Sequence, residues 1–182
     1  MADDLSYIGR ALSGLGRESE ALPLHQRALR IREAALGPGD LHVAFDLNHV
    51  GRALTGLGRA SEALPLHERA LRIHQAILRP GHPDLANDHN YLGQTLTALG
   101  RPGEAIPLHQ LALCIDEAAF GPHHPYVAID LTLAARALTA MGRPDEARPL
   151  HQRALRIREK ALGPDHPHTR QSRQSASDPT QP

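Results

Sequence analysis

The chain has 182 residues, enough for one domain with a hydrophobic core. Lys and Arg together count 20, as do Asp and Glu, so the basic excess typical of nucleic-acid-binding proteins is absent. The single cysteine, Cys114, excludes an intramolecular disulfide and fits a reducing compartment. No apolar run approaches the roughly 18 residues of a membrane-spanning helix, and no signal-like segment begins the chain. We expect a soluble cytoplasmic protein that binds neither nucleic acid nor membranes.

One ten-residue segment recurs four times at constant spacing. The copies LPLHQRALRI, LPLHERALRI, IPLHQLALCI and RPLHQRALRI begin 42 residues apart, without insertion or deletion, at Leu22, Leu64, Ile106 and Arg148. The flanking residues keep the same register. Self-similarity at a fixed period of this length predicts a tandem repeat protein.

Each repeat has the pattern of two helices. In the second repeat, Leu47, Val50 and Leu54 form one apolar stripe, and Gly58 then ends the helix by accepting a left-handed backbone. A second helix follows, with Pro65 near its first turn. Glycine and proline between repeats end one helix and start the next. In chain order we expect helices over residues 3–15, 18–36, 41–57, 60–78, 83–99, 102–120, 125–141 and 144–162.

The last residues differ in composition from the repeats. HPHTRQSRQSASDPTQP is similar to the start of a fifth first helix, but it is polar and lacks a continuing apolar stripe. We therefore expect four repeats over residues 1–167, with the first helix of repeat one truncated, and a polar, disordered tail over residues 168–182.

The repeat resembles a known family. The pattern of Leu47, Gly51, Leu54, Ala63 and Ala70 is similar to the tetratricopeptide repeat signature, and the 42-residue period with its LGPDHP linker resembles the longer variant of kinesin light chains. The resemblance implies an all-α fold, a right-handed solenoid of tandem helix–turn–helix repeats, over residues 5–167. The chain departs from the family at one position of the second helix, where a large aromatic residue is usual and histidine stands in every repeat.

These histidines are His25, His67, His109 and His151. Successive repeats lie roughly 10 Å apart, too far for their rings to share a metal ion. We expect neutral core histidines, and a fold that loses stability below about pH 6 because unfolding lets them charge. The loop histidines His82, His124 and His166, each before a proline, are interpreted as residues that start helices.

No arrangement of residues supports catalysis. Asp116 and Glu117 are adjacent on a helix, as are Asp145 and Glu146, so their carboxylates point about 100° apart and do not converge on a substrate. Cys114 has no base fixed beside it, and no glycine-rich loop could hold a phosphate. We expect no enzyme activity, no cofactor and no metal.

In tetratricopeptide repeats, two positions of each first helix usually face the concave groove. Carried over, the resemblance implies a groove lined by Arg10, Asn48, Arg52, Asn90, Gln94, Thr132 and Arg136, with Ser6 at the remaining position. Arginine recognises carboxylates with two parallel hydrogen bonds. The sequence therefore predicts a protein-interaction module that binds an extended, acidic peptide segment, the alternative being a solvated helix face.

Three further alternatives stay open. Leu111 and Cys114 are apolar where other repeats have arginine, which indicates either neutral drift or a contact patch on the outer helix of repeat three. Repeats at the two ends of an array expose apolar edges, so chains could also stack end to end as homo-oligomers. The chain could equally be the regulatory repeat arm of a larger signalling protein.

Overall fold

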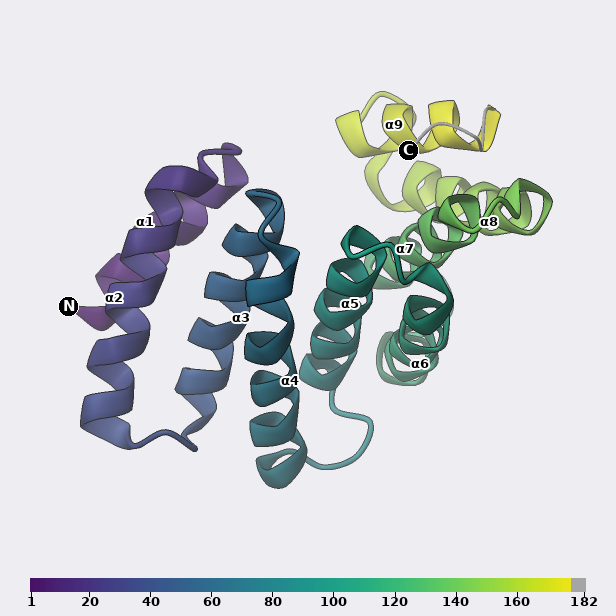
Figure 1. Cartoon of the computed structure of the whole chain (residues 1–182). Helices are drawn as coiled ribbons and strands as arrows, with labels where there is room; N and C mark the ends of the chain where they lie inside the picture. Colours follow the sequence, from purple (N-terminus) through teal and green to yellow (C-terminus); the bar gives the residue numbers. More distant parts are fainter. Residues whose placement is uncertain (178–182) are drawn as a thin grey trace. The chain divides into compact units, whose positions relative to one another are not determined.

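The computed structural model describes residues 1–177, and these form nine α-helices and no strand (Figure 1). The helices are α1 (Ala2–Gly14), α2 (Glu18–Leu36), α3 (Leu41–Gly56), α4 (Ala60–Ile77), α5 (Pro83–Ala98), α6 (Pro102–Phe120), α7 (Pro125–Ala140), α8 (Pro144–Leu162) and α9 (Pro167–Ser177). Seven of the eight predicted helices begin at the predicted residue, and no end differs by more than one residue. The prediction of an all-α repeat fold is confirmed. None of these helices is long and apolar enough to cross a lipid bilayer.

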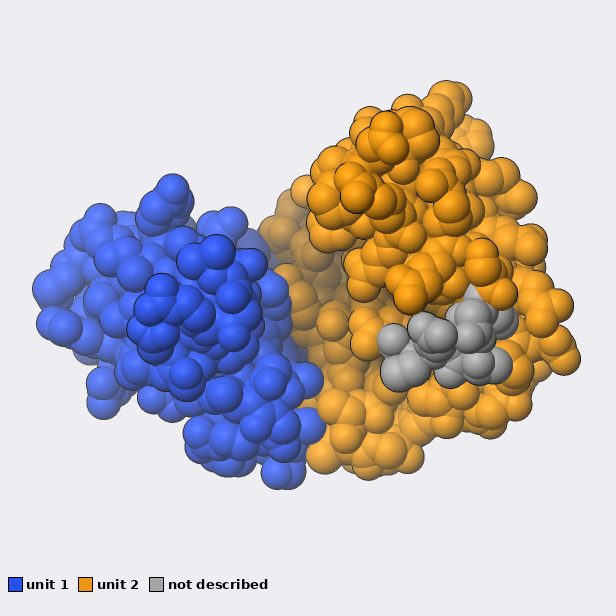
Figure 2. Space-filling view, turned by 90° about the horizontal axis from the view of Figure 1, so that it is seen from above, with its two compact units in different colours: residues 1–80 blue, residues 81–182 orange. Residues whose placement is uncertain are grey.

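The chain divides into two compact units, residues 1–80 and residues 81–182 (Figure 2). In unit 1, α1 pairs with α2 and α3 with α4, and the first helices α1 and α3 also touch. In unit 2, α5 pairs with α6 and α7 with α8, α5 touches α7, and α9 packs on α8. Each unit therefore contains two complete helix pairs with their first helices adjacent.

Glycine and histidine define the ends of the helices as expected. Gly58, which follows the C-cap of α3, has φ +75°, and the residues equivalent to it are also left-handed glycines. The ring nitrogens of His82, His124 and His166 accept the backbone N–H two residues later, at 3.2, 3.3 and 3.3 Å. The prediction that these loop histidines start helices is confirmed.

The prolines of the second helices lie deeper than predicted. Pro65 is the sixth residue of α4, in its second turn, and Pro23, Pro107 and Pro149 are placed equivalently. A proline there leaves the carbonyl four residues earlier without its usual helical donor. In α4 that residue is Ser61, which is exposed, so water can satisfy the carbonyl.

The expected tail is helical over most of its length. Pro167–Ser177 forms α9, so the prediction of a disordered segment from residue 168 is wrong as far as residue 177. Thr169 and Ser172 of α9 are buried, and packing of this face against α8 stabilises a helix that its polar composition does not. Residues 178–182 of the predicted tail lie outside the described residues.

The apolar core lies between the first and second helices. In unit 1, Leu22, Val50, Leu54 and Ala63 form one buried cluster, and Leu47 belongs to the next one along the helices. In unit 2, the corresponding clusters centre on Leu131 and Leu138 of α7. Most core side chains are alanine, valine or leucine, which allows the helices of a pair to approach closely.

Three of the four pairs are also held by a histidine ring on the glycine of the facing helix. A Cβ atom added to Gly51 would lie 2.6 Å from the His67 ring, and one on Gly9 or Gly93 would lie as close to His25 or His109. The three rings are each 1% exposed. In these three repeats the histidine ring therefore occupies the space that a side chain on the first helix would need.

Replacing Gly51 with alanine should lower the free energy of unfolding by about 1–3 kcal/mol, because the new methyl group displaces the His67 ring. Gly14→Ala is the matched control, since a Cβ there meets nothing within 4 Å. It should be neutral or stabilise by up to about 1 kcal/mol. Urea unfolding of both variants measures the difference, and equal stabilities would show that the ring is loosely held.

Candidate functional site

The seven predicted groove residues fall into an exposed and a less exposed set. Arg10, Arg52, Gln94 and Arg136 are exposed on α1, α3, α5 and α7, each at the same position of its repeat. Asn48 and Asn90 are only 3% and 6% exposed, and Thr132 is half-buried. The arginines and the glutamine can meet a partner, whereas the two asparagines face the interior.

The asparagines hold the core histidines. The Nδ1 atom of His67 lies 2.8 Å from Oδ1 of Asn48, and that of His109 lies 2.8 Å from Oδ1 of Asn90. Because the amide oxygen can only accept, each ring donates from Nδ1. A histidine and an asparagine 19 residues apart thus form one buried polar contact inside a helix pair.

The first and last repeats lack this contact. Ser6 stands at the asparagine position in repeat one, and its hydroxyl donates to Oδ1 of Asp46 at 2.9 Å. The His25 ring stacks instead on His49, with 5.2 Å between ring centroids. In repeat four the Thr132 hydroxyl donates to the Ala128 carbonyl at 2.7 Å. Ala135 replaces the glycine in that repeat and Thr132 replaces the asparagine, so repeat four differs at both positions that contact the histidine ring in repeats two and three.

Burial keeps the core histidines neutral. It lowers the pKa of His67 and of His109 to about 4, and it also lowers the pKa of His25 and His151. Protonation of the unfolded chain below about pH 6.5 therefore costs folded-state stability. The prediction of core histidines is confirmed, and no cluster of three or more potential metal-ligating side chains occurs in residues 1–177.

Unit 1 carries a concentration of positive charge on its first helices. Burial, together with nearby positive groups that include Arg52, Arg10 and Arg32, lowers the pKa of His49 to about 3. Arg10 and Arg52 belong to adjacent first helices and are both exposed. Their guanidinium groups therefore add to one positive potential over α1 and α3.

Charged side chains at a second pair of repeat positions were missed in the sequence. We name the first of these the acid position, which is occupied by Asp46, Asp88, Asp130 and Ser172. We name the second the partner position; it lies on the preceding second helix and is occupied by Arg32, His74, Asp116 and Arg158. Arg32 binds Asp46 with N–O distances of 2.5 and 2.6 Å, and Asp46 is fully buried. The signal was available, since aspartate recurs every 42 residues beside an apolar stripe.

Where α6 of repeat three meets α7 of repeat four, both positions carry a carboxyl group. Asp116 of α6 is 6% exposed and Asp130 of α7 is 1% exposed, and the two carboxyl groups interact. Oδ1 of Asp116 and Oδ2 of Asp130 are buried without a donor from another side chain or from the backbone of the described residues. Asn90 donates to Oδ1 of Asp130 at 2.5 Å. Burial, with the charges of Asp116 and Glu117, raises the pKa of Asp130 to about 7. Two carboxyl groups in contact share one proton, because two buried negative charges would repel.

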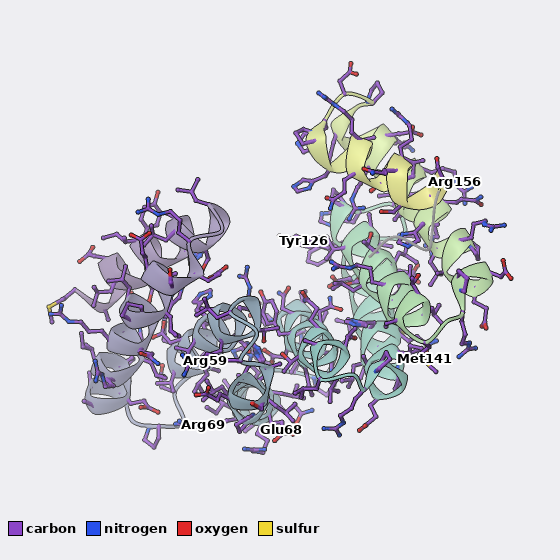
Figure 3. The ribbon with its side chains drawn as sticks, turned by 45° about the horizontal axis from the view of Figure 1, so that its top comes forward. Arg59, Glu68, Arg69, Tyr126, Met141 and Arg156 are labelled. Atoms are coloured by element: carbon purple, nitrogen blue, oxygen red, sulfur yellow. The ribbon has the colours of Figure 1, made fainter. Side chains whose placement is uncertain are left out.

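The proposed outer patch is exposed on α6. Leu111 is 46% exposed, and Cys114 is exposed as well. Arginines at the position of Leu111 connect neighbouring second helices: Arg69 (labelled in Figure 3) pairs with Glu33 at 2.6 Å and donates to the Pro38 carbonyl at 2.9 Å. The change to Leu111 therefore replaces an ion-pairing side chain with an apolar surface.

Asp130→Asn should make the protein more stable at pH 8 and less sensitive to pH. Asp130 keeps its proton up to about pH 7 in the folded chain, while the unfolded carboxyl ionises near 3.8. Wild-type stability thus falls as pH rises from about 4 to 7, by roughly a few kcal/mol. An asparagine keeps the hydrogen bonds without the charge.

Urea unfolding at pH 5 and pH 8 measures this gain, with exposed Asp145→Asn as the control that removes the same formal charge. An equal destabilisation of Asp130→Asn at both values would contradict the shared proton.

Comparisons with known proteins agree with this architecture. The tetratricopeptide repeat family model matches residues 4–76, 46–118, 84–160 and 131–178. A comparison with curated proteins gave no match. Among solved structures, a Podosopora anserina putative kinesin light chain with nearly identical TPR-like repeats has a TM-score of 0.77 at 24% identity, covering 96% of this chain and 83% of its own. A variant of that protein with one substitution gives 0.78, at 24% identity, with 96% and 82% covered.

BtubC (BKLC) from P. vanneervenii has a TM-score of 0.78 at 21% identity, covering 96% of this chain and 69% of its own. At these identities the structural likeness shows the fold alone, whereas the family model spans nearly every residue of the chain. The chain therefore belongs to the tetratricopeptide repeat family.

Proposed function

We propose that this protein is an interaction module whose first-helix faces bind an extended, acidic segment of a partner protein. Tetratricopeptide repeats generally mediate protein–protein interactions. The observation that supports the acidic preference is the exposure of Arg10 and Arg52 on adjacent helices, where both add positive potential around His49. Arginine forks bind carboxylates with two hydrogen bonds, so glutamate or aspartate side chains fit this face.

The exposed residues of the predicted groove would contact the partner segment, whereas the two asparagines have a different role. Arg10 and Arg52 serve in unit 1, and Gln94 and Arg136 serve in unit 2. Within residues 1–177, Arg10 and Arg136 form no ion pair with an acid of the chain itself, so their charge is available to a partner. Asn48 and Asn90 position the helices from inside and would not touch the segment.

Self-assembly is the second candidate. Tyr7, Ile8 and Leu15 of α1 and its C-cap are 73%, 49% and 72% exposed, and apolar side chains gathered on one helix favour association. Stacked chains would sediment faster as their concentration rises, whereas an interaction module without its partner would not.

Arg52→Glu should weaken binding of a fluorescent oligoglutamate peptide by about tenfold or more, because one arginine–carboxylate contact contributes roughly 1–3 kcal/mol. Arg72→Glu is the control, since Arg72 lies on α4, away from the first-helix face, and carries the same charge. Arg69 is unsuitable, since it pairs with Glu33. Fluorescence anisotropy at two salt concentrations measures both variants.

The control variant should lose less than about twofold, and wild-type affinity should fall as salt rises. Equal losses at Arg52 and Arg72 would mean long-range attraction without a defined face. An unchanged affinity of Arg52→Glu, with the fold intact by circular dichroism, would leave this face as solvated surface.

A further inference from the structure

Arg158 of α8 is a partly buried cation surrounded by neutral acceptors. Its Nη1 group donates to Oγ1 of Thr132 at 3.0 Å and to Oγ of Ser172, and Nη2 donates to the Ala128 carbonyl at 3.1 Å. Within the described part of the chain no Asp or Glu forms an ion pair with it. Burial accordingly lowers the pKa of Arg158. A cation removed from water without an opposite charge is costly, so a negative partner would stabilise it.

The equivalent arginine in the first repeat, Arg32, has the carboxylate partner that Arg158 lacks. Arg32 binds the buried carboxylate of Asp46 at 2.5 and 2.6 Å and the exposed carboxylate of Asp3 at 2.5 Å. Ser172 stands at the acid position opposite Arg158, where Asp46 stands opposite Arg32. The shorter serine side chain removes the carboxylate and leaves room beside the guanidinium.

That room is an open pocket in unit 2. It has a volume of about 160 Å³ and is lined by Arg158, Arg136, Thr132, Gln171, Ser172 and Ser175, together with His151. Liquid water occupies roughly 30 Å³ per molecule, so a carboxylate or phosphate group fits with space left over. Arg136 adds a second guanidinium with no ion pair among residues 1–177. The Ser172 hydroxyl accepts from Arg158 and retains its own proton to donate.

We propose that this pocket binds an oxyanion, a carboxylate or phosphate group, between Arg158 and Arg136, with Ser172 and Gln171 as additional donors. The anion takes the place that the Asp46 carboxylate fills beside Arg32. Its source is either an acidic side chain or a phosphate. Arg136 belongs to both the pocket and the proposed first-helix face, whereas Arg10 and Arg52 of unit 1 do not line the pocket. Variants at Arg52 and at Ser172 therefore test the proposed function and the pocket separately.

The test is a ¹H–¹⁵N NMR titration of the full chain with sodium phosphate and, separately, with sodium acetate, with chloride replaced to keep the ionic strength constant. At least one anion should shift the backbone amides of Thr132, Gln171 and Ser172 along a saturable curve. Saturation by phosphate, by acetate or by both identifies the anion that the pocket accepts. Failure of both anions to saturate these signals would overturn the proposal.

Ser172→Asp is the decisive variant, because it rebuilds the arrangement of Arg32 and Asp46 inside the same fold. It should raise Tm and weaken anion binding by at least about tenfold, since its carboxylate occupies the site. Ser177→Asp adds the same charge at an exposed position of α9 and should change binding by less than about twofold. Equal affinities of wild type and Ser172→Asp would contradict the pocket even if the oligoglutamate peptide still binds.

Discussion

A buried histidine ring on the glycine of the facing helix is the contact on which three of the four helix pairs depend. The ring leaves no room for a side chain on Gly9, Gly51 or Gly93. In two repeats it also binds a buried asparagine of the same first helix. A polar group inside a closely packed core is stable only when its partner is placed correctly. The ring, the glycine and the asparagine therefore fix how the two helices meet.

Repeat four shows what happens when this contact is altered. Ala135 replaces the glycine and Thr132 replaces the asparagine, and His151 remains only 3% exposed. The Thr132 hydroxyl binds backbone and accepts from Arg158, so it belongs to a different polar group. The helix pair is retained, and Thr132 at this first-helix position lines the pocket beside α9. A change in one core contact thus accompanies a new arrangement at the adjacent surface.

The contact between neighbouring pairs varies more than the contact within a pair. Arg32 with Asp46 forms a buried ion pair, Asp116 with Asp130 retains a proton, and Arg158 with Ser172 carries a cation without a carboxylate. These three pairs occupy equivalent positions of the repeat, and they differ in the charges of their side chains. One repeat architecture therefore contains a contact that is insensitive to pH near neutrality, one that is sensitive to it, and one suited to an external anion.

The helices could be predicted from the sequence because local signals set them. Glycine and proline recur at fixed positions of a 42-residue period, and these residues end and start helices regardless of distant contacts. Helix α9 was not predicted, because its stability comes from packing on α8 and not from its own polar residues. Helical composition alone does not show whether a polar segment finds a surface to cover.

The site was only partly predictable for a related reason. Family geometry predicted a groove that includes Arg10, Arg52 and Asn48; the two arginines are exposed, but the geometry could not show that Asn48 is buried against His67. Asn90 and Asp130 are 40 residues apart, and their contact depends on how successive pairs stack. Spacing along the chain reveals that such residues recur, whereas their partners become evident only in three dimensions.

The central claim is that each repeat is held by a buried, neutral histidine. An NMR pH titration of the imidazole carbons, with the rings assigned, measures this directly. A histidine in a short unfolded peptide charges near pH 6.5 and serves as the reference. We expect His67 and His109 to remain neutral in the folded protein down to about pH 4, the value to which burial lowers their pKa. If both rings instead charge together with the reference peptide while the chain stays folded, the claim is wrong.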